Sequence, residues 1–160
     1  MGKINYEEMR KIFKTLANIF QEVGMKWDMT ISEPYDGELK VNFQSGKDTF
    51  ISRSFYQEME TVHFWKSLSQ LIASAFVKQA PTGFMSSLWS SEEEGFFRVV
   101  FWIWTKNKNV ISWYVYPTKE VIYIREENSE EKVAHTHKEY LQRLIFTLTL
   151  ALEVYKHDSD

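Results

Sequence analysis

The chain has 160 residues, a formal net charge of −3 and no cysteine. The length is typical of a single domain over residues 1–160, and the absence of cysteine excludes disulfides and thiolate zinc sites. No apolar run approaches the ~20 residues of a membrane-spanning helix, the charged first residues lack a signal-peptide core, and no basic cluster offers a footprint for duplex nucleic acid. We therefore expect a cytoplasmic protein that binds neither a membrane nor duplex nucleic acid.

The first predicted helix begins after Asn5 and ends at Gly24. Asn5 is a good N-cap, and Glu8 stands where a capping box places its acidic partner. Gly24 is the residue type that most readily adopts the left-handed conformation after a helix. One apolar stripe at helical spacing consists of Met9, Ile12, Phe13, Leu16, Ile19, Phe20 and Val23.

Three strands are predicted next, because apolar and polar residues alternate on either side of two turns. The turns fall at 33–37 and 45–48, and the second pairs Phe43 with Phe50. The strands share one apolar face, which consists of Trp27, Met29, Ile31, Leu39, Val41 and Phe43. This part of the sheet should have one buried face and one face in water.

A second helix is predicted from about Glu58 to about Lys78, followed by a long connection over residues 80–95. Long connections inside a compact domain are usually functional or mobile. The large apolar residues of this one, including Leu88 and Trp89, indicate a short helical turn packed against the core, or a flap.

Three further strands are predicted between Phe96 and Arg125, with turns at 106–109 and 118–120. The pairing expected across these turns places Trp102 opposite Trp113, and places Phe101 and Tyr123 on either side of Tyr114. Since side chains alternate between the faces of a strand, two faces follow. The core face carries Val100, Trp102, Trp104, Ile111, Trp113, Val115, Ile122 and Ile124. The second face carries Val99, Phe101, Ile103, Ser112, Tyr114, Tyr116, Val121, Tyr123 and Arg125.

The last predicted helix begins after Ser129 or after Thr136, both of which can act as caps. Its main stripe consists of Leu141, Leu144, Ile145, Leu148, Leu152 and Tyr155, and Phe146, Leu150 and Val154 widen it. A helix that is apolar on more than one side is buried on more than one side. We expect this helix to lie between the sheet and either another helix or a second copy of the chain, as in a homodimer.

The predicted fold is therefore α+β, with the order α-βββ-α-βββ-α and helices packed on a mainly antiparallel, six-stranded sheet. This order is similar to that of the class I type III secretion chaperones and related small acidic dimeric proteins. The resemblance covers most of the chain as an order of elements and includes no sequence motif. A likeness of fold alone does not define a function.

No phosphate loop, nucleophile elbow, dinucleotide fingerprint or zinc-protease motif is present in the sequence. His135 and His137 form the only metal-like pair, and in a helix two residues so spaced point away from each other. Glu92, Glu93 and Glu94 follow serines and are expected in water rather than in a catalytic pair. The sequence therefore predicts no catalytic residue, no metal site and no cofactor.

The second face of the strands between 96 and 125 is too apolar for ordinary solvent-facing sheet and too rich in hydroxyls for an ordinary core. It can be a second buried layer under a helix, a protein-binding patch or a platform on which a base stacks. The candidate partner-binding residues are Phe101, Tyr114, Tyr116, Tyr123, Arg125 and, from the 80–95 connection, Trp89.

Two functions remain as hypotheses from the sequence. The first is a non-enzymatic protein-binding module, such as an inhibitor, an immunity protein or a chaperone-like adaptor, that acts by covering a surface of its partner. The alternative is a small-molecule or nucleotide-binding protein with the aromatic face as floor and the 80–95 loop as lid.

Overall fold

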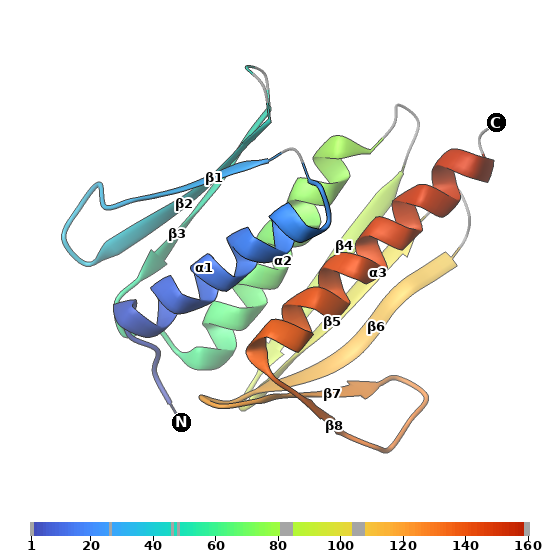
Figure 1. The fold of residues 1–160 in the computed structure, drawn as a ribbon. Helices are drawn as coiled ribbons and strands as arrows, with labels where there is room; N and C mark the ends of the chain where they lie inside the picture. Colours follow the sequence, from blue (N-terminus) through green and yellow to red (C-terminus); the bar gives the residue numbers. More distant parts are fainter. Residues whose placement is uncertain are drawn as a thin grey trace.

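The structure is a computed structural model that describes residues 2–25, 27–45, 47, 49–80, 85–103 and 108–158. Within these residues the chain forms three helices and eight strands, which make an α+β fold with two antiparallel sheets (Figure 1). The elements are α1 (Tyr6–Glu22), β1 (Asp28–Ser32), β2 (Glu38–Ser45), β3 (Thr49–Tyr56), α2 (Thr61–Gln79), β4 (Ser86–Glu93), β5 (Phe96–Ile103), β6 (Lys108–Pro117), β7 (Ile122–Glu126), β8 (Val133–His135) and α3 (His137–Asp158). None of the described helices is long and apolar enough to cross a membrane.

The α+β class and the antiparallel pairing agree with the sequence prediction, but the strands number eight rather than six. The 80–95 connection was predicted as a packed turn or a flap, but eight of its residues form β4, an edge strand paired with β5. The other additional strand is the short β8. The strands form one sheet in the order β1-β2-β3 and another in the order β4-β5-β6-β7-β8.

The caps of α1 are those predicted. The Glu8 amide donates a hydrogen bond to Asn5 Oδ1 at 2.9 Å, which satisfies one of the free N–H groups at the start of the helix. After the last turn Gly24 adopts a φ of +70°, a conformation that costs other residues free energy. The buried side of α1 consists of Met9, Ile12, Phe13, Leu16, Ile19 and Phe20.

The three-stranded sheet packs its apolar face on α1, as the ring contacts Phe13–Phe55 and Phe20–Phe43 show, with centroids 5.3 Å apart in each pair. Met29 lies opposite Phe43 in the β1–β2 register, as the predicted shared face requires. The predicted β2–β3 register was wrong by one residue, because Phe43 pairs with Ile51 and not with Phe50.

Helix α2 lies between the two sheets and contacts β3 on one side and β4, β5 and β6 on the other. Its buried residues occupy most of its circumference, as expected for a helix that is covered on several sides. Its polar residue Ser69 is buried too, and Ser69 Oγ lies 2.7 Å from both the Trp65 carbonyl oxygen and the Tyr140 hydroxyl. Burial raises the pKa of Tyr140 well above its ordinary value, despite the hydrogen bond with Ser69.

Helices α2 and α3 cover the same face of the five-stranded sheet. This inner face contributes to the core through Phe97, Val99, Phe101, Ile103, Ile111, Trp113, Val115, Ile122 and Ile124. Helix α3 crosses in front of the sheet in Figure 1, and it also packs against α1 and α2. The expectation that α3 lies between the sheet and other helices is therefore confirmed, although Phe146 and Leu150 are 47% and 65% exposed.

The start of α3 is a capping box at the second of the two predicted positions. The Glu139 amide donates to Thr136 Oγ1 at 3.1 Å, and the Thr136 amide donates to Glu139 Oε1 at 2.8 Å. The amide of Thr136, and then its side chain, hold the pKa of the Glu139 carboxyl below its ordinary value.

The pairing of β5 with β6 differs from the predicted one and reverses the faces of β5. Trp113 lies opposite Val99 rather than Trp102, and Phe101 lies opposite Ile111 rather than Tyr114. Trp102 lies opposite Asn109, four residues from its predicted partner, and an irregularity between Phe101 and Trp102 makes this displacement three residues for the rest of β5. A displacement by an odd number of residues moves the side chains of a strand to the opposite face relative to its neighbour. Trp104, which was predicted on the core face, lies outside the described residues.

Candidate functional site

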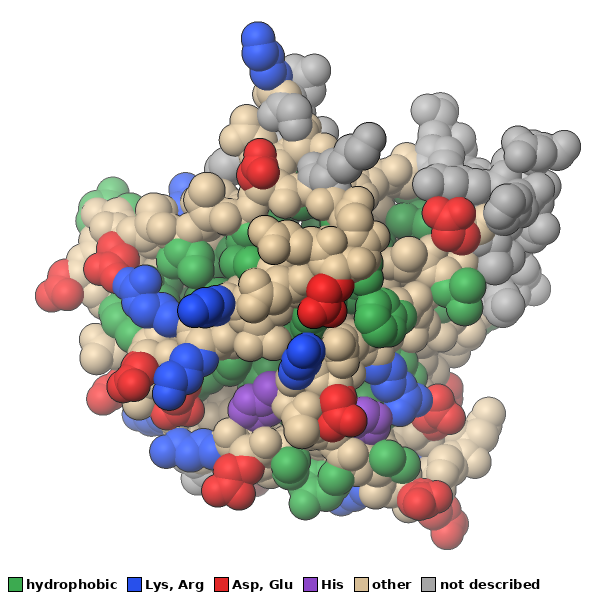
Figure 2. All heavy atoms as spheres, in the orientation of Figure 1, with side chains coloured by type: hydrophobic (Ala, Val, Ile, Leu, Met, Phe, Trp, Pro, Cys, Tyr) green, Lys and Arg blue, Asp and Glu red, His purple; other side chains and the backbone are tan. Residues whose placement is uncertain are grey.

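The outer face of the five-stranded sheet is the candidate site, because α2 and α3 both pack on its inner face. Trp89 of β4 is 52% exposed there, and Tyr123 of β7 is 37% exposed. In the orientation of Figures 1 and 2 this face is turned away from the viewer. The helical side shown in Figure 2 carries charged side chains of both signs with apolar side chains scattered between them.

Four side chains from four adjacent strands make one row across the outer face. The guanidinium carbon of Arg98 lies 5.5 Å from the ring centroid of Trp89 and 5.2 Å from that of Tyr114. On the other side, the guanidinium carbon of Arg125 lies 4.1 Å from the Tyr114 centroid. The row is therefore Trp89–Arg98–Tyr114–Arg125, in which rings and cations alternate from β4 to β7 and attract one another electrostatically.

A second group extends the row along the strands. The ring centroid of Phe96 lies 5.2 Å from that of Tyr116 and 6.2 Å from that of Tyr114. Lys132, just before β8, places Nζ 3.9 Å from the Tyr116 centroid. We call the combined surface the aromatic–cationic face; it consists of Trp89, Phe96, Arg98, Tyr114, Tyr116, Tyr123, Arg125 and Lys132.

Polar contacts hold both arginines of this face in place. Arg98 donates to Glu127 at 2.6 Å, and the same carboxylate accepts a hydrogen bond from the Ser112 hydroxyl. Arg125 donates to the backbone oxygen of Ser129 at 3.0 Å. Because these partners fix the guanidinium groups before a ligand arrives, binding on this face would lose less side-chain entropy.

The structure brings together five of the six side chains that were predicted as partner-binding. Trp89, Tyr114, Tyr116, Tyr123 and Arg125 belong to the aromatic–cationic face, whereas Phe101 lies on the inner face and is only 2% exposed. Phe101 is therefore a core residue, and the displaced pairing of β5 with β6 explains the error.

Arg98 is the central residue of the row, and the sequence prediction missed it. Its neighbours in β5 are apolar on both sides, so alternation alone does not choose a face for this strand. A charged residue in such a strand marks the side that faces water. Arg98 thus assigns Phe96, Val100 and Trp102 to the outer face, and this signal was present in the sequence.

The histidines have other partners. His135 Nδ1 lies 3.0 Å from the Val133 oxygen and its Nε2 lies 3.3 Å from Arg143. His137 Nε2 lies 3.1 Å from the Thr118 oxygen, and its ring packs against Trp65 with centroids 4.9 Å apart. Within the described ranges, no group of three or more His, Asp or Glu side chains could hold a metal ion.

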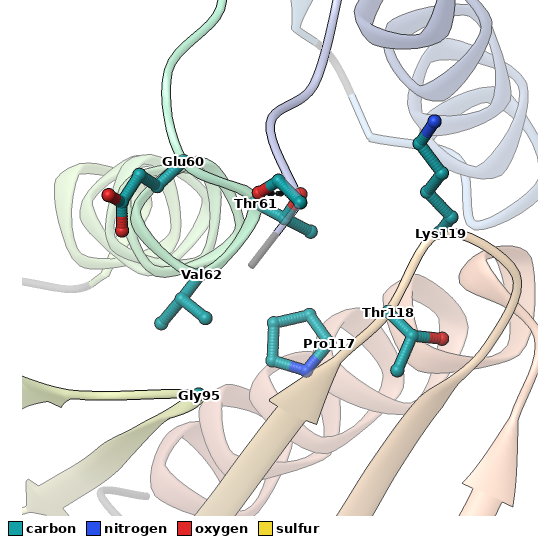
Figure 3. A pocket seen from close by; sticks show the side chains of 8 residues that line it. Glu60, Thr61, Val62, Gly95, Pro117, Thr118 and Lys119 are labelled. Carbon is teal, nitrogen blue, oxygen red and sulfur yellow. Dashed lines mark hydrogen bonds between the residues drawn. The ribbon is translucent and has the colours of Figure 1, made fainter.

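One hollow lies away from the aromatic–cationic face, at the start of α2. It has a volume of about 360 Å³, and its lining comes from four parts of the chain (Figure 3). The lining residues are Gly2, Glu60, Thr61, Val62, Gly95, Pro117, Thr118 and Lys119. The Gly2 oxygen already accepts hydrogen bonds from the Thr61 amide and hydroxyl, at 3.1 and 2.9 Å. At this hollow the start of α2 therefore already has part of its hydrogen-bonding capacity satisfied. The lining also includes one acidic and one basic residue, Glu60 and Lys119.

Comparison with known proteins gives no relative. No family model matches the chain, and no curated protein and no solved structure is significantly similar to it. The functional argument therefore rests on the geometry of the aromatic–cationic face.

Proposed function

We propose that the chain is a non-enzymatic protein-binding module that acts by covering a surface of its partner with the aromatic–cationic face. An inhibitor, an immunity protein and a chaperone-like adaptor all work in this way. The observation that supports the proposal is the row Trp89–Arg98–Tyr114–Arg125 on the sheet face opposite the helices. Trp, Tyr and Arg are the residue types that supply most of the binding energy in protein interfaces.

The chemistry of the face favours a protein over a nucleotide. Two guanidinium groups already lie against the ring of Tyr114, so little of that ring is left for a stacked base. The alternative with a lid loses its support, because β4 lies within the sheet beside β5 and is part of the floor. The absence of cysteine is compatible with action in the cytoplasm, where thiols stay reduced.

Affinity capture from the native host tests the proposal with a matched pair of variants. Tyr114→Ala with Tyr123→Ala removes two rings from the aromatic–cationic face. Tyr35→Ala with Tyr56→Ala removes two exposed rings elsewhere, since these side chains are 73% and 56% exposed. Native mass spectrometry identifies the co-purifying polypeptide, and calorimetry with that purified polypeptide measures the affinity.

We expect the wild type and the Tyr35/Tyr56 variant to bind one polypeptide with equal affinity. The Tyr114/Tyr123 variant should bind at least about 30-fold more weakly, the effect of losing an interface hot spot of ~2 kcal/mol. Its melting temperature should match that of the control pair. Equal affinity of both variants, or the absence of any co-purifying polypeptide with the wild type, would contradict the proposal.

A further inference from the structure

β4 is an edge strand that has no lysine or proline to guard it against pairing with another chain. It pairs with β5 on one side, and no described strand pairs with its other side. An exposed edge offers unpaired backbone N–H and C=O groups, and natural proteins usually guard it with charged side chains, especially Lys, with Pro, with a bulge or with a short strand. The eight residues of β4, SSLWSSEE, include neither Lys nor Pro, and their charges are confined to Glu92 and Glu93 at one end.

The other edge strands of the two sheets are shorter or carry a cation. β8 has three residues and follows Lys132, and β1 has five residues. β3 has the length of β4 but includes Arg53. β4 is therefore the longest edge strand without a cationic guard among the described residues.

Helix α2 contacts β4 without closing this edge. Gln70 donates to Ser90 Oγ at 2.5 Å, and Glu92 lies 2.8 Å from His63 Nδ1 and 3.9 Å from Lys66 Nζ. These contacts reach side chains on the inner face of β4. Since they are made by side chains, these contacts do not themselves pair with the backbone of β4.

We propose that two copies of the chain pair antiparallel through β4, with Trp89 of one copy opposite Trp89 of the other. In this register Ser87 lies opposite Ser91 of the second copy, and Ser86 lies opposite Glu92 of the second copy. No acidic residue then faces another acidic residue, so this register avoids repulsion between like charges across the pair. If each copy were moved by one residue, Leu88 would lie opposite Glu92 of the second copy. That register fits less well, because it places an apolar side chain opposite a charged one.

Pairing through β4 would join the two five-stranded sheets into one. The row Trp89–Arg98–Tyr114–Arg125 of one copy would then continue into the same row of the other copy, with the two Trp89 rings adjacent at the centre. The pairing itself depends only on the exposed edge of β4. Only its consequence, a doubled aromatic–cationic face, rests on the proposed function.

Disulfide trapping tests the register, because the chain has no cysteine of its own. Ser87→Cys and Ser91→Cys are made as separate variants and oxidised alone and as a mixture. We expect a disulfide-linked dimer in the mixture and little in either variant alone, because each position faces the other one across the pair. Phe146→Cys on α3 is the control for collision and for pairing through the helices.

Light scattering on the purified, untagged protein gives the second readout. The wild type should have twice the chain mass of 19.1 kDa, and Trp89→Lys should be a monomer with the melting profile of a folded protein, because it opposes two cations at the centre of the pair. A monomeric wild type, or trapping at Phe146→Cys in place of the mixture, would overturn the inference. Neither readout uses a partner, so this inference and the proposed function can fail separately.

Discussion

The guanidinium carbon of Arg125 lies 4.1 Å from the centre of the Tyr114 ring, on a strand pair in which these two residues are directly opposite each other. A cation at this distance is attracted by the electrons of the ring face. The same guanidinium group donates to the Ser129 oxygen, so it links the sheet to the turn that precedes β8. Arg125 therefore orders both the aromatic–cationic face and its border.

Arg125→Gln should lower the free energy of unfolding by about 0.5–1 kcal/mol, the usual value of a cation–π pair at an exposed site. Urea denaturation measures the change. Lys14→Gln removes a cation from the exposed side of α1 and serves as the control. A loss for Arg125→Gln no larger than that of the control would show that the ring contact adds no stability.

Phe101→Ala should lower the free energy of unfolding by about 3–5 kcal/mol, because it removes a buried ring and leaves a cavity. Tyr123→Ala, on the outer face of the same sheet, should cost less than about 1 kcal/mol. Chemical denaturation of the two variants beside the wild type makes the comparison. Similar costs for both would contradict the assignment of Phe101 to the core and Tyr123 to the surface.

Tyr140 should make the protein less stable in strong alkali. Burial raises the pKa of Tyr140 above its ordinary value of 10.0, so above that pH the unfolded chain loses a proton that the folded chain keeps. The unfolded state then binds fewer protons, and the free energy of unfolding falls as the pH rises. Below pH 10 both states keep the proton and this effect is absent.

Tyr140→Phe removes this part of the pH dependence. The difference in unfolding free energy between the wild type and the variant should be constant below pH 10 and should shift in favour of the variant above it. Tyr6, whose pKa burial also raises, is present in both proteins and cancels from the difference. Urea midpoints measured across this pH range would refute the expectation if the two curves stayed parallel.

Thr136→Ala should cost about 1 kcal/mol of stability, because it leaves the Glu139 amide without its capping oxygen. Thr136→Ser keeps the hydroxyl and is the matched control. Thermal unfolding of the two variants measures the difference. If both variants melted at the same temperature, the capping hydroxyl would not contribute to the stability of α3.

Elements with clear local signals could be predicted from the sequence. Asn5, Gly24 and Thr136 mark helix ends through their own backbone chemistry, and the structure places a helix end at each. The shared face of β1 and β2 follows from plain alternation of apolar and polar residues. In these places one residue type or one period decides the local structure.

Features that depend on long-range pairing were predicted less well. Apart from Arg98, β5 is apolar on both faces, so alternation of apolar and polar residues did not show which side enters the core. β4 is rich in serine, a residue that is common in loops, and pairing with β5 makes it a strand. Of the candidate site, the side chains on β6 and β7 were predicted, and Arg98 was not.

The position of α2 between the two sheets has a consequence for how this chain could have changed during evolution. Removing β1–β3 would expose one flank of α2 to water, and removing β4–β8 would expose the other. Neither sheet could therefore be duplicated, exchanged or transferred to another protein as a module without a new cover for this helix. We expect the two sheets to have been inherited together, with α2 as the element that tolerates the least change.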